Sequence, residues 1–185
     1  MSLSNLVDGG FFRQEGSQFS LATFNVRGLS SKVKREALCR DLAKYKIDVC
    51  AVQETKICET RQEYCGGYVL YTLSPTCRHY GLAFAVRSSL EPRVERVWSV
   101  SDRVAGISLQ LGKKSTLSIL NVYAPTSARC RDNNFELDEF YDTLTRAIHD
   151  VDSSSLFFVV GDFNAKAGTK QQDESCIGSH GRGIR

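Results

Sequence analysis

The sequence predicts an α/β or α+β sandwich, and three observations support this prediction. Strand-like and helix-like segments alternate along the chain from Leu21 onward, with no internal repeat. Their order, β-α-β, then several β, then α-β, is typical of sheets covered by helices. The chain has 185 residues, 42% hydrophobic and 24% charged, and this globular composition excludes a fibre or a disordered tail. A chain of this length can form one domain with a buried core.

The first strand and the first helix are recognised by their hydrophobic patterns. Residues 20–26 are largely apolar and are expected to form a strand that ends at Arg27-Gly28. Residues 31–46 are expected to form a helix, because apolar side chains recur three and four positions apart among lysines and arginines. The apolar positions are Val33, Ala37, Leu38, Leu42 and Tyr45.

Several strands follow this helix. Strands are expected at residues 48–53, 67–73, 80–87, 104–111 and 115–123. Pairs of turn-forming residues punctuate this part of the chain, at Gly66-Gly67 and at Ser74-Pro75. The segment Gly112-Lys113-Lys114 separates the last two of these strands and predicts a hairpin turn.

A second helix and a last strand complete the expected elements. Asn133 and Glu136 have the spacing of a capping box, which predicts the start of a helix. Apolar residues then keep helical spacing at Phe140, Leu144, Ala147, Ile148 and Val151. The apolar residues 155–160 are expected to form the last strand.

Composition excludes several classes of protein. The seven cysteines are odd in number and no pair has C-x-x-C spacing, so a zinc site has no support. Cys39 and Cys50 lie in apolar patterns and are expected to be buried thiols in a reducing compartment, the nucleus or the cytoplasm. Residues 1–19 lack a secretory pattern and are expected to be a flexible leader. No apolar run approaches the length of a membrane span. The net charge of +3 neither requires nor excludes an anionic partner.

Four predicted strands run directly into polar side chains, which are, in chain order, Asn25, Glu54, Tyr123, and Asp162 with Asn164. Strand ends in layered α/β folds are where sites are built, because the strands are rigid and the loops beyond them are free to vary. If the four ends meet at one edge, they bring together two carboxylates, two carboxamides and a phenol. These oxygen-rich groups suit Mg²⁺ or Mn²⁺ rather than zinc.

Hydrolysis of a phosphate ester needs this set of groups. The phosphorus is shielded by negative oxygens, so a divalent cation is needed to neutralise charge and to stabilise the leaving oxygen. A carboxylate can hold or deprotonate the attacking water. An amide and a phenol can donate hydrogen bonds to the oxyanion without repelling it.

Four motifs in this order resemble the endonuclease/exonuclease/phosphatase superfamily: T-F-N-V-R-G-L, V-Q-E-T, N-V-Y-A-P-T and V-V-G-D-F-N-A. They are most similar to endonuclease domains of non-LTR (LINE-type) retrotransposons and of their craniofacial-development-protein-like relatives. The resemblance covers residues 20–185 and implies two mixed β-sheets packed face to face with helices outside, a four-layer α/β/β/α sandwich. It also implies a nicking DNA endonuclease with Mg²⁺ or Mn²⁺ as cofactor, the DNA phosphate backbone as partner, and a monomer; the sequence indicates no protein partner.

The resemblance also implies roles for single residues. Glu54 would be the main metal ligand, and Asn25 beside it would orient metal-bound water. Asp162 would position and activate the attacking water. Hydrogen bonds to the scissile phosphate would come from Asn164 and Tyr123.

Basic residues and histidines are interpreted separately. Arg27 follows Asn25 in a loop and is a candidate contact to the DNA backbone, from its charge and position. The first helix carries Lys32, Lys34, Arg35, Arg40, Lys44 and Lys46. Acidic neighbours partly offset them, so a solvated helix face is favoured over a DNA-binding stripe. No role is assigned to His79, His149 or His180.

Members of the superfamily continue beyond the Gly-Asp-Phe-Asn motif with further strands and a Ser-Asp-His segment, whereas few residues follow Asn164 here. The resemblance therefore implies a C-terminally incomplete domain lacking its last strands, with an exposed apolar edge near 155–163 and impaired catalysis. Three of the site residues also have a structural alternative: Asn25 in an Asx turn, Glu54 exposed after a strand, and Tyr123 in the core. The alternative functions are a non-catalytic interaction module on the same scaffold and a same-fold phosphatase or sphingomyelinase.

Overall fold

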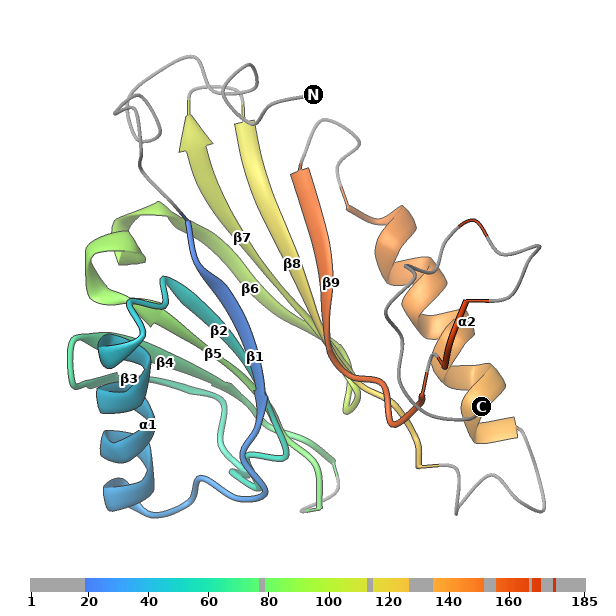
Figure 1. Ribbon diagram of the computed structural model, residues 1–185, viewed down its shortest axis with the longest axis horizontal. Helices are drawn as coiled ribbons and strands as arrows, with labels where there is room; N and C mark the ends of the chain where they lie inside the picture. The colour runs from blue at the N-terminus through green and yellow to red at the C-terminus, as the bar shows by residue number, and fades with distance from the viewer. Residues whose placement is uncertain are drawn as a thin grey trace.

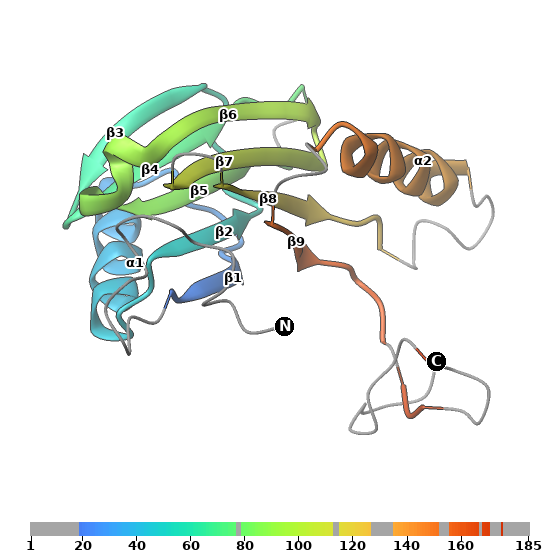
Figure 2. The same cartoon turned by 90° about the horizontal axis from the view of Figure 1, so that it is seen from above.

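The computed structural model of the protein describes residues 19–76, 79–112, 115–126, 135–151, 156–166, 168–170 and 175. Two β-sheets pack face to face, and a helix lies on the outer face of each (Figure 1 and Figure 2). The layers are helix, sheet, sheet, helix, which confirms the predicted four-layer α/β/β/α sandwich.

The first sheet has five strands in the order β1-β2-β5-β4-β3. They are β1 (Leu21–Asn25), β2 (Val49–Gln53), β3 (Arg61–Cys65), β4 (Tyr68–Leu73) and β5 (Leu82–Arg87). β1 and β2 are parallel, whereas the other neighbours are antiparallel. Helix α1 (Lys32–Lys44) covers the outer face, and a 3-10 helix, η2 (Ser88–Arg93), follows β5.

The second sheet has four strands in the order β6-β7-β8-β9. They are β6 (Val94–Ser101), β7 (Val104–Gly112), β8 (Ser115–Tyr123) and β9 (Leu156–Asp162). β8 and β9 are parallel, whereas β6, β7 and β8 pair antiparallel. Helix α2 (Phe135–His149) packs on the outer face through Phe140, Leu144 and Ala147, as its spacing predicted.

Three apolar layers hold the sandwich together. One lies between the two sheets and includes Phe84, Ile107 and Ile119, the second lies between α1 and the first sheet, and the third lies under α2. Cys39 and Cys50 are fully buried, as predicted. No helix among the described residues is long and apolar enough to cross a membrane.

Helix α1 buries the predicted Leu38 and Leu42, but the two ends of its predicted apolar face are exposed. Its buried side chains are Arg35, Leu38, Cys39 and Leu42. Val33 and Tyr45, which the apolar spacing assigned to the interior, are 74% and 69% exposed. Arg35 enters the interior because its guanidinium donates hydrogen bonds to Glu63 and to two main-chain oxygens. The other basic residues of this segment are exposed, in line with the predicted solvated face.

Two strands were not predicted, β3 and β6. Both lie at sheet edges, where one side of the strand pairs with no described neighbour. Their sequences, Arg-Gln-Glu-Tyr-Cys and Val-Glu-Arg-Val-Trp-Ser-Val-Ser, therefore carry many polar residues and lack a clear apolar run.

Strand β9 lies at the other edge of the second sheet. Phe157 and Phe158 are 45% and 42% exposed, which confirms the expected apolar edge near residues 155–163. The predicted leader apart from Phe19, the capping residue Asn133, the turn lysines 113 and 114, and His180 lie outside the described residues.

Candidate functional site

Four strand ends meet at one end of the sandwich. In the parallel pair β1 and β2, Asn25 lies opposite Gln53, and Glu54 follows directly. In the parallel pair β8 and β9, Tyr123 lies opposite Asp162. Because the strands of each pair are parallel, their C-terminal ends lie side by side. The packing of the two sheets then brings the ends of both pairs together. The convergence that the sequence analysis required is therefore present.

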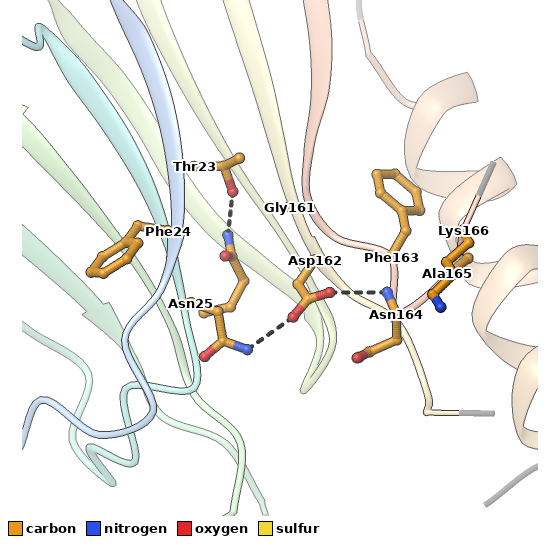
Figure 3. Close-up of a pocket in the computed structure, with 10 residues that line it drawn as sticks. Thr23, Phe24, Asn25, Gly161, Asp162, Phe163, Asn164, Ala165 and Lys166 are labelled. Carbon is orange, nitrogen blue, oxygen red and sulfur yellow. Dashed lines mark hydrogen bonds between the residues drawn. The ribbon is translucent and has the colours of Figure 1, made fainter. Parts of the chain in front are cut away.

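The side-chain amide of Asn25 links the two carboxylates of the site. Its Nδ2 atom donates to Glu54 Oε1 at 2.7 Å and to Asp162 Oδ2 at 2.9 Å. Its Oδ1 atom accepts the backbone N–H of Arg27 at 3.1 Å. Only this orientation of the carboxamide satisfies two acceptors and one donor at once. Figure 3 shows the Asn25 amide pointing toward the Asp162 carboxylate, to which it is hydrogen-bonded.

Tyr123 contacts the first of these carboxylates. Its hydroxyl donates to Glu54 Oε1 at 2.9 Å. Burial, followed by the hydrogen bond to Glu54 and the charge of that carboxylate, raises the pKa of Tyr123 to about 12. The phenol therefore keeps its proton at neutral pH and acts as a hydrogen-bond donor.

The loop after β9 fixes the second carboxylate. The backbone N–H of Asn164 donates to Asp162 Oδ1 at 2.9 Å (Figure 3), and Asn164 Nδ2 donates to the carbonyl oxygen of Ala124 at 2.7 Å. Asp162 thus accepts one hydrogen bond on each oxygen, which holds its carboxylate in a defined plane. The amide of Asn164 keeps one N–H that has no acceptor among the described residues.

Backbone geometry at the site is unusual. Arg27, Glu54 and Asn164 have φ values of 49°, 54° and 47°, in the left-handed region that residues other than glycine seldom adopt. Such conformations cost free energy and tend to cluster at functional sites. Gly161, with φ 153°, precedes Asp162, and a Cβ atom there would lie 1.9 Å from the carbonyl oxygen of Val122. Only glycine allows β9 to approach β8 this closely at the site.

A buried polar layer that was not predicted from the sequence lies directly beneath the site. Gln53 Nε2 donates to Asn121 Oδ1 at 2.7 Å and to Thr23 Oγ1 at 2.9 Å. Asn121 Nδ2 donates at 3.0 Å to the carbonyl oxygens of Val52 and Ala83. The available signal was the presence of two carboxamides inside strands that are otherwise apolar.

An arginine from the turn between β6 and β7 packs behind Tyr123 and was also missed. Arg103 donates to the Tyr123 carbonyl oxygen at 3.2 Å and to the Tyr80 hydroxyl at 3.0 Å, and it pairs with Glu136 of α2. Its place in a turn gave no local indication of these contacts.

A cleft of about 600 Å³ opens beside the cluster, between the ends of β1 and β9. Phe24, Phe163 and Lys166 are among its lining residues. Arg27 is exposed at the start of the loop after β1, and no ion pair joins its side chain to a described residue. The cleft is lined by Asn25 and Asp162 of the cluster and by one lysine, so this side of the site carries both charges.

The donor set fits a hard divalent cation. Mg²⁺ is held by one or two protein carboxylates and keeps several waters. Glu54 Oε2 accepts no hydrogen bond from the described residues, so one oxygen of this carboxylate is available to a cation. Across the described part of the chain, no group of three or more His, Cys, Asp or Glu side chains forms the kind of cage that encloses other metals. Glu54 is therefore the carboxylate that could hold such an ion, and Asp162 lies on the other side of the Asn25 amide.

Comparison with known proteins gives a consistent result. Residues 22–173 match the Endonuclease/Exonuclease/phosphatase family. Craniofacial development protein 2 of Bos taurus is 25% identical over 171 residues, which cover 91% of this chain. The chain spans about 28% of the length of that relative.

Three solved structures share the fold at low sequence identity. The AP endonuclease LMAP of Leishmania major has a TM-score of 0.63 at 18% identity, covering 80% of this chain and 56% of that one. D. rerio TDP2, complexed with a single-strand DNA product, has a TM-score of 0.55 at 18% identity, covering 80% and 61%. The endonuclease domain of TRAS1, a telomere-specific non-LTR retrotransposon, has a TM-score of 0.55 at 12% identity, covering 80% and 62%.

Proposed function

The chain belongs to the endonuclease/exonuclease/phosphatase family, and we propose that it is a metal-dependent phosphodiester hydrolase that nicks DNA. The observation that supports this most strongly is the single hydrogen-bonded cluster of Asn25, Glu54, Tyr123 and Asp162, which come from four different strands. Two carboxylates, an amide and a phenol held together beside an open cleft are the groups that this reaction needs.

Glu54 would hold the divalent cation through Oε2, while Oε1 stays bonded to Asn25 and Tyr123. We assign Asn25 a supporting role as a metal-site residue, because its amide fixes Glu54 and can orient a water beside it. When bound, Mg²⁺ or Mn²⁺ would neutralise phosphate charge and stabilise the leaving oxygen.

Asp162 would act on the attacking water. Its two oxygens are held by Asn25 and by the Asn164 backbone, and each retains a lone pair. The carboxylate would accept a proton from the water as the oxygen attacks phosphorus and the bond to the leaving oxygen breaks.

Asn164 and Tyr123 would bind the phosphate oxygens. The free N–H of Asn164 can donate directly, since its other N–H is already bonded to Ala124. The Tyr123 hydroxyl has a single proton, which it donates in a hydrogen bond to Glu54. To donate to phosphate, this hydroxyl would rotate away from Glu54. Arg27, which is exposed, would contact the DNA backbone.

The assignment of DNA as the substrate and of nicking as the reaction is supported only by similarity of fold. TDP2 of D. rerio was solved with a DNA product and the TRAS1 domain is an endonuclease, but the likeness to both is one of fold. A non-catalytic module on this scaffold and a same-fold phosphatase or sphingomyelinase are the competing functions, and substrate tests separate them.

Incubation of supercoiled circular DNA with Mg²⁺ tests the proposal, because a circle without ends reports endonuclease activity alone. We expect relaxed circles to form with Mg²⁺ and not to form when a chelator is present. With Asp162→Asn they should form on the order of 10²-fold more slowly. Asp41→Asn, which changes an exposed carboxylate on α1, serves as the matched control and should nick like the unaltered chain. Absence of relaxed circles, or nicking unaffected by Asp162→Asn, contradicts the proposal; turnover of a phosphomonoester or of sphingomyelin instead would support the competing enzymes.

A further inference from the structure

Arg103 is hydrogen-bonded to Tyr123 through both its main chain and its side chain. The backbone N–H of Tyr123 donates to the Arg103 carbonyl oxygen at 2.9 Å, and the Arg103 guanidinium donates to the Tyr123 carbonyl oxygen at 3.2 Å. The β7–β8 ladder has its last pair at Val104 and Val122. The hydrogen bonds of Arg103 therefore continue the pairing of β8 one residue beyond the ladder, to Tyr123.

The guanidinium is also enclosed between aromatic rings. It lies 4.4 Å from the ring centroid of Tyr80 and 5.6 Å from that of Tyr123, and it donates to the Tyr80 hydroxyl at 3.0 Å. Its side chain is only 11% exposed although it arises from a turn, and the carboxylate of Glu136 balances its charge. A planar guanidinium with this set of partners is held in one orientation.

These contacts converge on a residue whose ring position matters for the site. The Tyr123 hydroxyl reaches Glu54 Oε1 at 2.9 Å, so a small displacement of β8 or of the ring would break that contact. Three contacts of Arg103 reach this tyrosine, and those to Tyr80 and Glu136 hold the guanidinium in place beside it.

We propose that Arg103 is a positioning residue of the site: it fixes the end of β8 and the ring of Tyr123, so that the phenol meets Glu54 and, during the reaction, the phosphate. The catalytic part of this inference rests on the proposed function, whereas the placement of the phenol can be measured without any activity.

Arg87 offers a matched control at the opposite end of the first sheet. It donates to Asp48 and to the carbonyl oxygen of Ile47, both at 3.0 Å, and its guanidinium lies 6.0 Å from the ring centroid of Tyr68. It thus makes the same kinds of contact as Arg103 without touching the site. Arg103→Met and Arg87→Met each remove a stacked, ion-paired guanidinium and keep an apolar side chain.

The experiment places 3-fluorotyrosine at position 123 and records its ¹⁹F signal, the melting temperature, and kcat and KM for nicking. With Arg103→Met we expect the signal to move or broaden and kcat to fall about tenfold or more, with KM changed by less than about twofold. Arg103→Lys retains the charge but loses the planar guanidinium with its several N–H donors, so its kcat should remain lowered. Arg87→Met should lower the melting temperature and leave both the signal and kcat unchanged.

The two parts of the inference fail in different ways. If Arg103→Met lowers only the melting temperature and leaves the ¹⁹F signal as in the unaltered chain, Arg103 is a structural residue and the proposal is wrong. If the unaltered chain shows no nicking, the proposed function fails, and the ¹⁹F signal of Arg103→Met alone decides whether Arg103 positions Tyr123.

Discussion

Gln53 donates a hydrogen bond to Asn121 at 2.7 Å across the interface of the two sheets. Both side chains are almost completely buried, at 1% and 0% exposed. Gln53 lies one residue before Glu54 and Asn121 lies two residues before Tyr123, so this bond joins the two halves of the site directly beneath it. Because Asn121 also donates to carbonyl oxygens of β2 and β5, the spacing of the sheets is defined at the point where the cluster forms.

Removal of this bridge should destabilise the protein. Asn121→Leu removes one acceptor of the Gln53 amide and the side-chain donor to two buried carbonyl oxygens, at a cost of about 2 kcal/mol in the free energy of unfolding. Urea denaturation measures it. Gln110→Leu, at an exposed position of the neighbouring strand β7, should change the free energy by less than about 0.5 kcal/mol. Equal stability of Asn121→Leu and the unaltered chain would show that the bridge contributes nothing.

Asn25→Asp should place three carboxylates together at the site. The variant loses both N–H donors that link Glu54 to Asp162, and it adds a like charge beside them. We expect a lower melting temperature without metal and a larger rise on addition of Mg²⁺ than the unaltered chain shows. Differential scanning calorimetry with and without Mg²⁺ measures both effects. A melting temperature equal to that of the unaltered chain in both conditions would refute the electrostatic part of the account.

The raised pKa of the Tyr123 phenol predicts that the protein loses stability at high pH. Burial and Glu54 raise its pKa from 10.0 to about 12, so the folded state holds this proton more tightly than the unfolded state. The stability that results is fully present below about pH 10 and is lost as the pH rises toward 12. Tyr123→Phe removes this contribution, and its unfolding free energy should therefore fall less steeply over this range. Parallel pH dependence of the two proteins in urea denaturation would contradict the predicted shift.

Thiol reactivity should follow burial. Burial raises the pKa of both Cys39 and Cys50 to about 12, whereas Cys58 is exposed. At mildly alkaline pH we expect iodoacetamide to modify Cys58 rapidly and to spare Cys39 and Cys50 until the protein is unfolded. Peptide mass spectrometry gives the extent of modification at each position. Modification of Cys50 in the folded protein at the rate of Cys58 would mean that the first sheet opens readily.

The strand ends of the site could be predicted because their signal is local. An apolar run followed by Asn25, Glu54 or Asp162 can be read without knowing the partner strand, and the same runs placed the first, second and last strands. The edge strand β9 was found by its apolar composition, whereas the polar edge strands β3 and β6 were missed.

The supporting contacts could not be predicted, because they join residues far apart in the chain. Gln53 meets Asn121 and Arg103 meets Glu136 only after the sheets and α2 have packed. The burial of Arg35 in α1 could not be predicted for the same reason: Glu63, on an unpredicted strand, accepts its hydrogen bond. Hydrophobic spacing alone cannot include a partner that tertiary packing supplies.

The central claim is that Glu54 anchors a divalent cation in a cluster built from four strand ends. Calorimetric titration of Mg²⁺ or Mn²⁺ into the protein tests it most directly, with Glu54→Gln as the variant and Glu95→Gln, an exposed acid on β6, as the control. The account predicts saturable binding to the unaltered chain and to Glu95→Gln, and loss of that binding in Glu54→Gln. Absence of binding to the unaltered chain, or equal binding to Glu54→Gln, would contradict it and would favour a non-catalytic module.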